Sequence, residues 1–369
     1  MIVEPKSARL YDAAHPLHTV SGGTLSEVDV AYETYGTLNA DRSNAVYICH
    51  ALTGDAHAAG EHADGKPGWW ANMIGPGKPI DTDRWFVVAS NLLGGCAGTT
   101  GPSSIDPATG ETYGLDFPLL LVSDFVTVHR RLGEHLGITR WAACVGGSLG
   151  GMQVLDWALH HPEDMDNAII VAASSRLTAQ NIAFSAVARH AIMRDSEFHG
   201  GRFHERGTAP DRGLSVARMM AHITYLSDEA FGEKFGRQAQ RGELSRNFGV
   251  DFAVESYLEH QGQKFLSRFD ALSYLYLSRA MDYFDCLSND DACALLGRSP
   301  VRFLVMSFDS DWRYSTKDSR RIVRHLERAR QPVSFREIAS PWGHDSFLLE
   351  IPDYHDTVRA FLDRAWEAL

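Results

Sequence analysis

The chain has 369 residues, of which 44% are hydrophobic, and a formal net charge of −12. This length suits one large domain with an insertion, or two domains, while the acidic balance disfavours nucleic-acid binding, which normally needs a basic surface. The sequence has no apolar run of membrane-spanning length, no signal-peptide pattern at its start and no zinc-binding spacing among its five cysteines, so we expect a cytoplasmic protein without disulfides or a metal site.

The first half of the chain contains short apolar segments that are typical of β-strands. Residues 28–36 alternate between apolar and polar side chains, as a half-exposed antiparallel strand does. Four continuously apolar runs suit the buried strands of a parallel sheet: 45–50, 86–90, 141–145 and 168–172. A helical pattern at 152–160 separates the last two runs. This alternation predicts a mostly parallel α/β sheet flanked by helices.

The character of the sequence changes after residue 176. Long stretches with helical spacing and no strand signal follow: 181–193, 213–226 and 271–284. Gly262 and the polar run 237–242 are predicted as turns between these helices. We therefore predict an inserted helical lid over residues 177–296, between core segments at 1–176 and 297–369.

The most informative motif is the G-x-S-x-G sequence around Ser148, between the strand at 141–145 and the helix at 152–160. In a nucleophile elbow, a serine sits on a sharp strand-to-helix turn with its hydroxyl exposed. Such a turn strains the serine backbone, and a side chain on Gly146 or Gly150 would collide with the neighbouring strand or helix. The alternative is a glycine-rich turn with an incidental serine. The flanking strand and helix favour Ser148 as a nucleophile.

A nucleophilic serine needs a base and an acid that orients the base. The predicted strand at 301–308 leads into Asp309 and Asp311, and the strand at 333–338 leads to His344 in a Gly-His-Asp loop. Serine, then an acid, then a histidine is the chain order of the triad in α/β-hydrolases. By position alone, either aspartate could orient His344.

Six further segments carry a more specific signal. They are 50–55 (HALTGD), 91–96 (NLLGGC), 100–104 (TGPSS), 147–153 (GSLGGMQ), 256–262 (SYL followed by QG) and 343–348 (GHDSFL). In combination they resemble the homoserine O-acyltransferases of the α/β-hydrolase superfamily, and the resemblance runs from about residue 15 to about residue 365. These enzymes move an acyl group from a coenzyme A thioester to the hydroxyl of L-homoserine, which activates it for methionine biosynthesis.

The resemblance implies a ping-pong mechanism through an acyl-serine. Ser148 would attack the thioester and His344 would move the protons. In the family the acid is followed by a bulky residue. Asp311, which precedes Trp312, matches that position, so Asp311 is favoured over Asp309.

Two backbone amides are expected to stabilise the tetrahedral intermediate. One is the amide of Leu149, directly after the nucleophile, and the other lies in the loop after the strand at 45–50, where Leu52 is the best candidate.

Homoserine carries a carboxylate and an ammonium, so its site needs one cation and one anion. The resemblance places these at Arg218 and at Asp345, beside His344. A guanidinium suits a carboxylate because its donors match both oxygens. The alternatives are a helix-surface ion pair for Arg218 and a helix N-cap for Asp345.

Arg313 decides between two acyl donors. Family members transfer either acetyl or succinyl, and succinyl ends in a carboxylate that needs a cation. Arg313 follows Asp311 by two residues, at a position where acetyl-transferring members look apolar, and a buried unpaired guanidinium would be costly. Succinyl-CoA is therefore the preferred donor and acetyl-CoA the alternative. Arg313 could instead point outward and pair with Asp309 or Asp318.

Other activities fit the same fold. An esterase or thioesterase would use the triad without needing Arg218 and Asp345, and a serine acyltransferase would differ by one methylene in its acceptor. The expected partners are L-homoserine and succinyl-CoA, or acetyl-CoA, with no cofactor besides these substrates. The resemblance also implies a homodimer assembled through the helical insertion.

Overall fold

The computed structural model describes residues 2–289, 291–298 and 300–369. Its centre is an eight-stranded sheet, and the strands, in chain order, are β1 (Lys6–Tyr11), β4 (Val28–Tyr35), β5 (Ala45–Cys49), β8 (Phe86–Ser90), β9 (Ala143–Gly147), β10 (Asn167–Val171), β11 (Arg302–Phe308) and β12 (Val333–Ile338). The spatial order is β1-β4-β8-β5-β9-β10-β11-β12. Strands β1, β4 and β8 pair antiparallel, and all the other neighbours pair parallel. The predicted α/β-hydrolase sheet is confirmed.

Four short strands lie outside this sheet. They form two pairs, β2 (Leu17–His18) with β3 (Thr24–Leu25) and β6 (Ile74–Gly75) with β7 (Ile80–Asp81).

Helices cover both faces of the sheet, as continuously apolar parallel strands require. They are α1 (Val122–Leu136), α2 (Leu149–His160), α8 (Ala292–Leu296), α9 (Thr316–Arg328) and α10 (Pro352–Trp366). The alternating side chains of β5 show the two layers. Tyr47 packs with the apolar cluster of α1, α2 and α9, whereas Ile48 packs with the cluster of α10. No helix in the described ranges is both long and apolar enough to cross a membrane.

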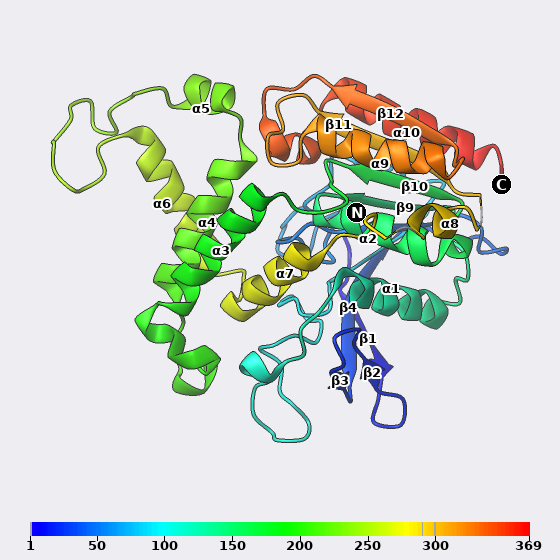
Figure 1. Cartoon of the computed structure of the whole chain (residues 1–369), viewed down its shortest axis with the longest axis horizontal. Coiled ribbons are helices and arrows are strands. Elements are labelled where there is room, and N and C mark those ends of the chain that lie inside the picture. Colours follow the sequence, from blue (N-terminus) through cyan, green and yellow to red (C-terminus); the bar gives the residue numbers. More distant parts are fainter. Residues whose placement is uncertain (1, 290, 299) are drawn as a thin grey trace.

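The segment between β10 and β11 is helical. It contains α3 (Ala179–Met193), α4 (Asp211–Tyr225), α5 (Asp228–Lys234), α6 (Ala253–Leu266), α7 (Ala271–Tyr283) and α8. Helix α4 packs between α3 and α6, and these helices with α5 form a lobe beside the sheet (Figure 1). We call α3–α6 the helical lobe. Helix α8 packs instead on α2 and α9.

Two local predictions need correction. Gly262 lies inside α6 and not in a turn. A Cβ atom at this position would come within 2.3 Å of Ser215 Oγ on α4. This glycine lets the two helices pack closely. The strand predicted at 141–145 begins and ends two residues later, since Gly146 and Gly147 still pair with β10, and α2 begins directly after Ser148.

Candidate active site

Ser148 occupies a strained turn between β9 and α2. Its backbone angles are φ 58° and ψ −124°, a conformation that a residue with a side chain rarely adopts. The two flanking glycines make room for the turn. A Cβ on Gly146 would lie 2.3 Å from Gly150, and one on Gly150 would lie 2.0 Å from the Cys49 carbonyl oxygen. This is the geometry of a nucleophile elbow.

Ser148 is hydrogen-bonded to His344, and His344 to Asp311. The distances are 2.9 Å from His344 Nε2 to Ser148 Oγ and 2.7 Å from His344 Nδ1 to Asp311 Oδ2. Asp309 lies apart from this chain of contacts, because its Oδ1 accepts a hydrogen bond from the backbone of Ser340 at 2.9 Å. The structure therefore places Asp311, and not Asp309, against the imidazole.

Backbone hydrogen bonds hold the Asp311 side chain in place. The side chains of Asp311 and His344 are buried, and Asp311 Oδ1 accepts hydrogen bonds from the backbone amides of Arg313 and Tyr314, both at 2.9 Å. Since Nδ1–H donates to Asp311, Nε2 is free to accept the proton of Ser148.

The two predicted oxyanion donors are the residue that follows Ser148 and a residue that lines the same cavity. Leu149 is the first residue of α2, where the helix dipole adds positive potential, and Leu52 lines the same cavity as Ser148. In the part of the chain that the structure describes, neither backbone amide has a hydrogen-bond acceptor. Both N–H groups are thus available to a ligand.

A buried polar network holds these two segments together. The side-chain amide of Gln153 on α2 donates to the carbonyl oxygens of His50 and Leu149, both at 3.1 Å. Its Oε1 accepts from His129 Nε2 at 2.9 Å, and His129 Nδ1 accepts from Tyr47 Oη at 2.7 Å. Burial lowers the pKa of His129 to about 4, so its ring is neutral near pH 7. The network fixes the loop that carries Leu52 onto the helix that begins at Leu149.

A cavity of about 190 Å³ contains the Ser148 and His344 side chains, and we call it the inner cavity. The helical lobe supplies one wall and the loops at the ends of the strands supply the other. The lining residues are Ala51, Leu52, Thr53, Gly54, Trp69, Ser148, Arg218, His222, Tyr225, Arg268, Met281, Arg313, His344, Asp345, Phe347 and Leu348. The structure thus brings Arg218, Arg313 and Asp345 together with the triad.

Sequence reasoning missed His222 and Tyr225. Both lie on the face of α4 that carries Arg218, four and seven residues further on, so helical spacing from Arg218 could have found them. Burial, followed by the positive charge of Arg218, lowers the pKa of His222 to about 3. The His222 ring is therefore neutral, and its Nε2 has no hydrogen-bond partner in the described part of the protein.

Arg218 and Asp345 do not take their alternative structural roles, which were a helix-surface ion pair for Arg218 and a helix N-cap for Asp345. Within the described residues Arg218 forms no ion pair, and its guanidinium lies over the rings of Phe265 at 4.6 Å and Tyr225 at 5.7 Å. Asp345 lies inside a 3₁₀ turn, Gly343–Leu348, and not at its N-cap. Burial raises the pKa of Asp345 to about 6, while His344 and Arg218 lower it.

Arg313 is buried, with only 8% of its surface exposed. Its Nη1 donates to Thr224 Oγ1 at 2.6 Å, and its guanidinium lies 5.5 Å from the centre of the Tyr225 ring. Arg313 does not point outward to pair with Asp309 or Asp318, because these two aspartates bond instead to Ser340 and Ser315. Among the described residues no carboxylate pairs with this cation.

Comparison with known proteins agrees with this geometry. Residues 44–351 match the model of the α/β hydrolase fold family. The chain is 56% identical to a homoserine O-succinyltransferase of Nocardioides sp. (strain JS614), over 98% of both chains. It is 54% identical to one of Magnetococcus marinus, over 100% of this chain and 96% of the other.

Solved structures are also similar. The homoserine O-acetyltransferase from Bacillus anthracis superposes with a TM-score of 0.90 at 28% identity, over 98% of each chain. Esterase E22 superposes with a TM-score of 0.88 at 28% identity, over 98% of this chain and 100% of the other. The chain therefore belongs to the homoserine O-acyltransferase family of the α/β-hydrolase superfamily.

Proposed function

We propose that this enzyme transfers the succinyl group of succinyl-CoA to the hydroxyl of L-homoserine, as a step of methionine biosynthesis. The observation that carries the proposal is a cavity in which Ser148 and His344 of the triad lie together with Arg218, Asp345 and Arg313, a buried cation that pairs with no carboxylate of the described residues. Relatives more than 50% identical over nearly the whole chain are homoserine O-succinyltransferases, which supports the same substrates.

The first half of the reaction forms an acyl-serine. Ser148 Oγ attacks the thioester carbonyl carbon while His344 Nε2 takes its proton. The amides of Leu52 and Leu149 bind the oxyanion, and each such donor typically contributes about 3 kcal/mol to the transition state. The C–S bond then breaks, and His344 protonates the departing thiolate. Free CoA leaves and the succinyl group stays on Ser148.

The second half transfers the acyl group to the acceptor. The homoserine hydroxyl attacks the ester carbonyl while His344 Nε2 takes its proton, the bond to Ser148 Oγ breaks, and His344 returns a proton to the serine. Because CoA leaves before homoserine reacts, ping-pong kinetics are expected. This chemistry uses the protein's side chains, its backbone amides and the two substrates, so we infer that the enzyme needs no metal or other cofactor.

The ends of both substrates find complementary charges in the inner cavity. Arg218 matches the homoserine carboxylate and Asp345 its ammonium, and their positions hold the hydroxyl toward His344. Arg313 pairs with the terminal carboxylate of the succinyl group, because a buried cation whose described contacts are a hydroxyl and aromatic rings gains most from an anionic ligand.

The release of free thiol from succinyl-CoA and from acetyl-CoA, with and without L-homoserine, tests the proposal. We expect rapid, homoserine-dependent release from succinyl-CoA, a covalent succinyl adduct by mass spectrometry when donor alone is added, and neither with Ser148→Ala. L-Serine in place of homoserine should react much more slowly.

Three other outcomes would contradict parts of the proposal. A preference for acetyl-CoA would remove the role of Arg313 but leave a homoserine acyltransferase. Equal rates with serine would remove the acceptor assignment. Release that is independent of any acceptor would indicate a thioesterase, the activity class nearest to the similar esterase E22 structure.

We also infer that two copies associate through the helical lobe. Exposed apolar side chains occur on two of its helices: Ile182, Val187 and Met193 on α3, and Val216 and Ile223 on α4. A second copy that covers them would give a homodimer, as the family resemblance implies. Sedimentation analysis should give a dimer mass, and Val187→Glu should shift it toward the monomer.

All five cysteines are free thiols, which fits the reducing cytoplasm.

A further inference from the structure

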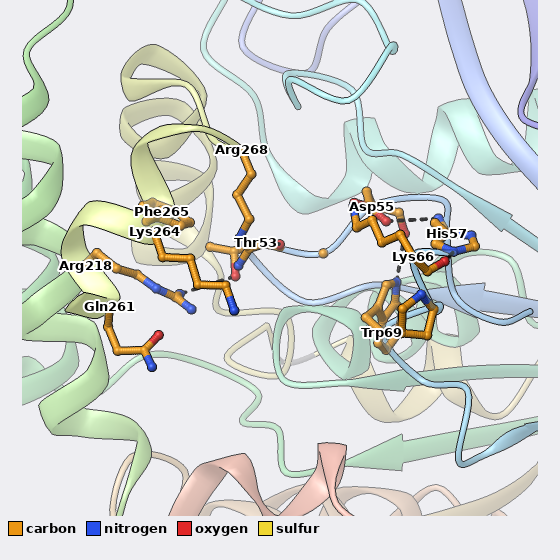
Figure 2. A pocket seen from close by; sticks show the side chains of 12 residues that line it. Thr53, Asp55, His57, Lys66, Trp69, Arg218, Gln261, Lys264, Phe265 and Arg268 are labelled. Atoms are coloured by element: carbon orange, nitrogen blue, oxygen red, sulfur yellow. Dashed lines mark hydrogen bonds between the residues drawn. The ribbon is translucent and has the colours of Figure 1, made fainter. Parts of the chain in front are cut away.

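A second cavity, lined by the loop that follows β5 and by residues of the helical lobe, adjoins the inner cavity. Figure 2 shows the side chains that line this second cavity. Its volume is about 290 Å³, and we call it the outer cavity. The two cavities share five lining residues, Thr53, Gly54, Trp69, Arg218 and Arg268. A long ligand whose reactive end lies at Ser148 can therefore continue into the outer cavity.

Cations dominate the outer cavity. Lys66 comes from the loop after β5, Arg218 from α4, and Lys264 and Arg268 from the end of α6 and the turn that follows it. Figure 2 shows that the lysines lie on opposite walls, Lys264 on the helical lobe and Lys66 beside Trp69. Asp55 is the one carboxylate in this lining.

These four cations lack anionic partners of their own. In the described ranges none forms an ion pair, and the two arginines donate only to Thr53, Arg218 to Oγ1 at 3.5 Å and Arg268 to the carbonyl oxygen at 3.1 Å. Both guanidiniums lie over the Phe265 ring, at 4.6 Å and 5.3 Å. Desolvation, and then the charge of Arg218, lowers the pKa of Arg268. Like charges gathered in this way repel one another unless an anion binds between them.

The net charge of −12 makes this cluster of cations a stronger indication of an anion-binding site. The global field repels a polyanionic donor, so binding depends on a local positive site. A rival site is a basic groove beside α9 that contains Lys317 and Arg324. That groove shares only the buried Arg313 with the inner cavity, and so offers a poorer route to Ser148.

We infer that Lys66, Lys264 and Arg268 bind the phosphate groups of the CoA donor in the outer cavity, while Arg218 serves the acceptor. The inference rests on the proposed function for the identity of the donor. Trp69 and Phe265 give the outer cavity apolar surface for the arm that joins the phosphates to the thioester. The lysines thus determine donor affinity without touching the reacting atoms.

The double variant Lys66→Ala/Lys264→Ala tests this inference. Both side chains are exposed, so folding should be unaffected. We expect the KM for succinyl-CoA to rise roughly 10- to 100-fold, because each exposed lysine–phosphate contact contributes roughly 3- to 10-fold, with kcat nearly unchanged. The KM for S-succinyl-N-acetylcysteamine, which has the same thioester and no phosphates, should not change. Added salt should raise only the KM for succinyl-CoA.

The matched control is Lys317→Ala/Arg324→Ala in the groove beside α9, which should leave both KM values as they are in the wild type. Calorimetric titration with free CoA gives a readout that does not depend on turnover, and the outer-cavity variant should bind CoA more weakly than the wild type. Equal losses with both donors, unchanged CoA binding, or a loss in the control variant would overturn the inference. If the wild type bound CoA through these lysines but transferred no succinyl, only the proposed function would fail.

Discussion

Asp345 connects the pH of the solution to the binding of the acceptor. Its raised pKa of about 6 means that the carboxylate gains a proton as the pH falls through that value, and a neutral acid cannot pair with the homoserine ammonium. We therefore expect kcat/KM for homoserine to fall below about pH 6, mainly because KM rises. Initial rates at saturating succinyl-CoA, measured between about pH 5 and about pH 8, check this.

The control for this prediction is the half-reaction with the donor alone. Acyl-serine formation uses Ser148 and His344 but not Asp345, so its rate at the pH optimum should be similar in the wild type and in Asp345→Asn. The variant should bind homoserine weakly at every pH, without the transition near pH 6. A wild-type transition of equal size in the donor half-reaction would contradict the assignment.

Arg313 should show opposite effects on activity and stability. In Arg313→Met the succinyl carboxylate loses its partner, and kcat/KM for succinyl-CoA should fall roughly 30-fold or more, since truncating one member of a buried charge pair costs about 2 kcal/mol or more. The free enzyme loses an unpaired buried charge, so its free energy of unfolding should stay the same or rise. Urea unfolding and steady-state kinetics measure the two effects. A large loss of stability with unchanged donor preference would show that Arg313 is structural.

At the scale of elements, the position of α2 against the loop after β5 depends on Gln153. Gln153→Leu removes three hydrogen bonds, and it leaves the His50 carbonyl oxygen without its donor and His129 Nε2–H without its acceptor. We expect the free energy of unfolding to fall by about 1–3 kcal/mol, and kcat to fall roughly tenfold as the amides of Leu52 and Leu149 lose their alignment. Gln263→Leu, on an exposed part of α6, is the control and should change neither quantity. A normal kcat in Gln153→Leu would separate the network from catalysis.

Another element contact anchors the same loop. Glu33 on β4 is buried, and its two carboxylate oxygens lie 2.9 Å from His57 Nδ1 and 2.7 Å from His62 Nε2. Such a trio has the composition of a cation site. Since the proposed chemistry needs no metal, we expect dialysis against EDTA to leave both kcat and the melting temperature unchanged, whereas Glu33→Gln should lower the melting temperature. Loss of activity on chelation that Zn²⁺ restores would contradict this.

The elements also show where sequence reasoning succeeds and where it stops. Strand and helix types were predictable because apolar periodicity is local. The elbow was predictable because a Cβ atom on either of its glycines would collide with backbone atoms that lie a few residues away or on the adjacent strand. Gly262 looked like a turn because its reason, the close approach of Ser215 on α4, lies almost fifty residues away in the chain. By position alone Asp309 and Asp311 were equivalent, and only the turn after β11 decides which one faces His344.

For the molecule as a whole, the inner cavity lies between two parts of the chain. The sheet side supplies Ser148 and His344, with Asp311 bonded to His344, whereas the helical lobe supplies Arg218 and the neighbouring side chains of α4. The triad was therefore accessible from strand order, but the lining from α4 depends on how the lobe packs beside the sheet, which no local pattern reports. The family resemblance located Arg218 because related proteins share the packing of the lobe beside the sheet.

The backbone of Ser148 has a consequence for how the protein can be improved. A positive φ at a residue with a side chain costs about 1–3 kcal/mol, and glycine would remove that cost. Selection for heat resistance alone would thus favour Ser148→Gly, which gives a sturdier but inert protein. Any search for hardier variants must therefore score turnover together with melting temperature, because at this position the two move in opposite directions.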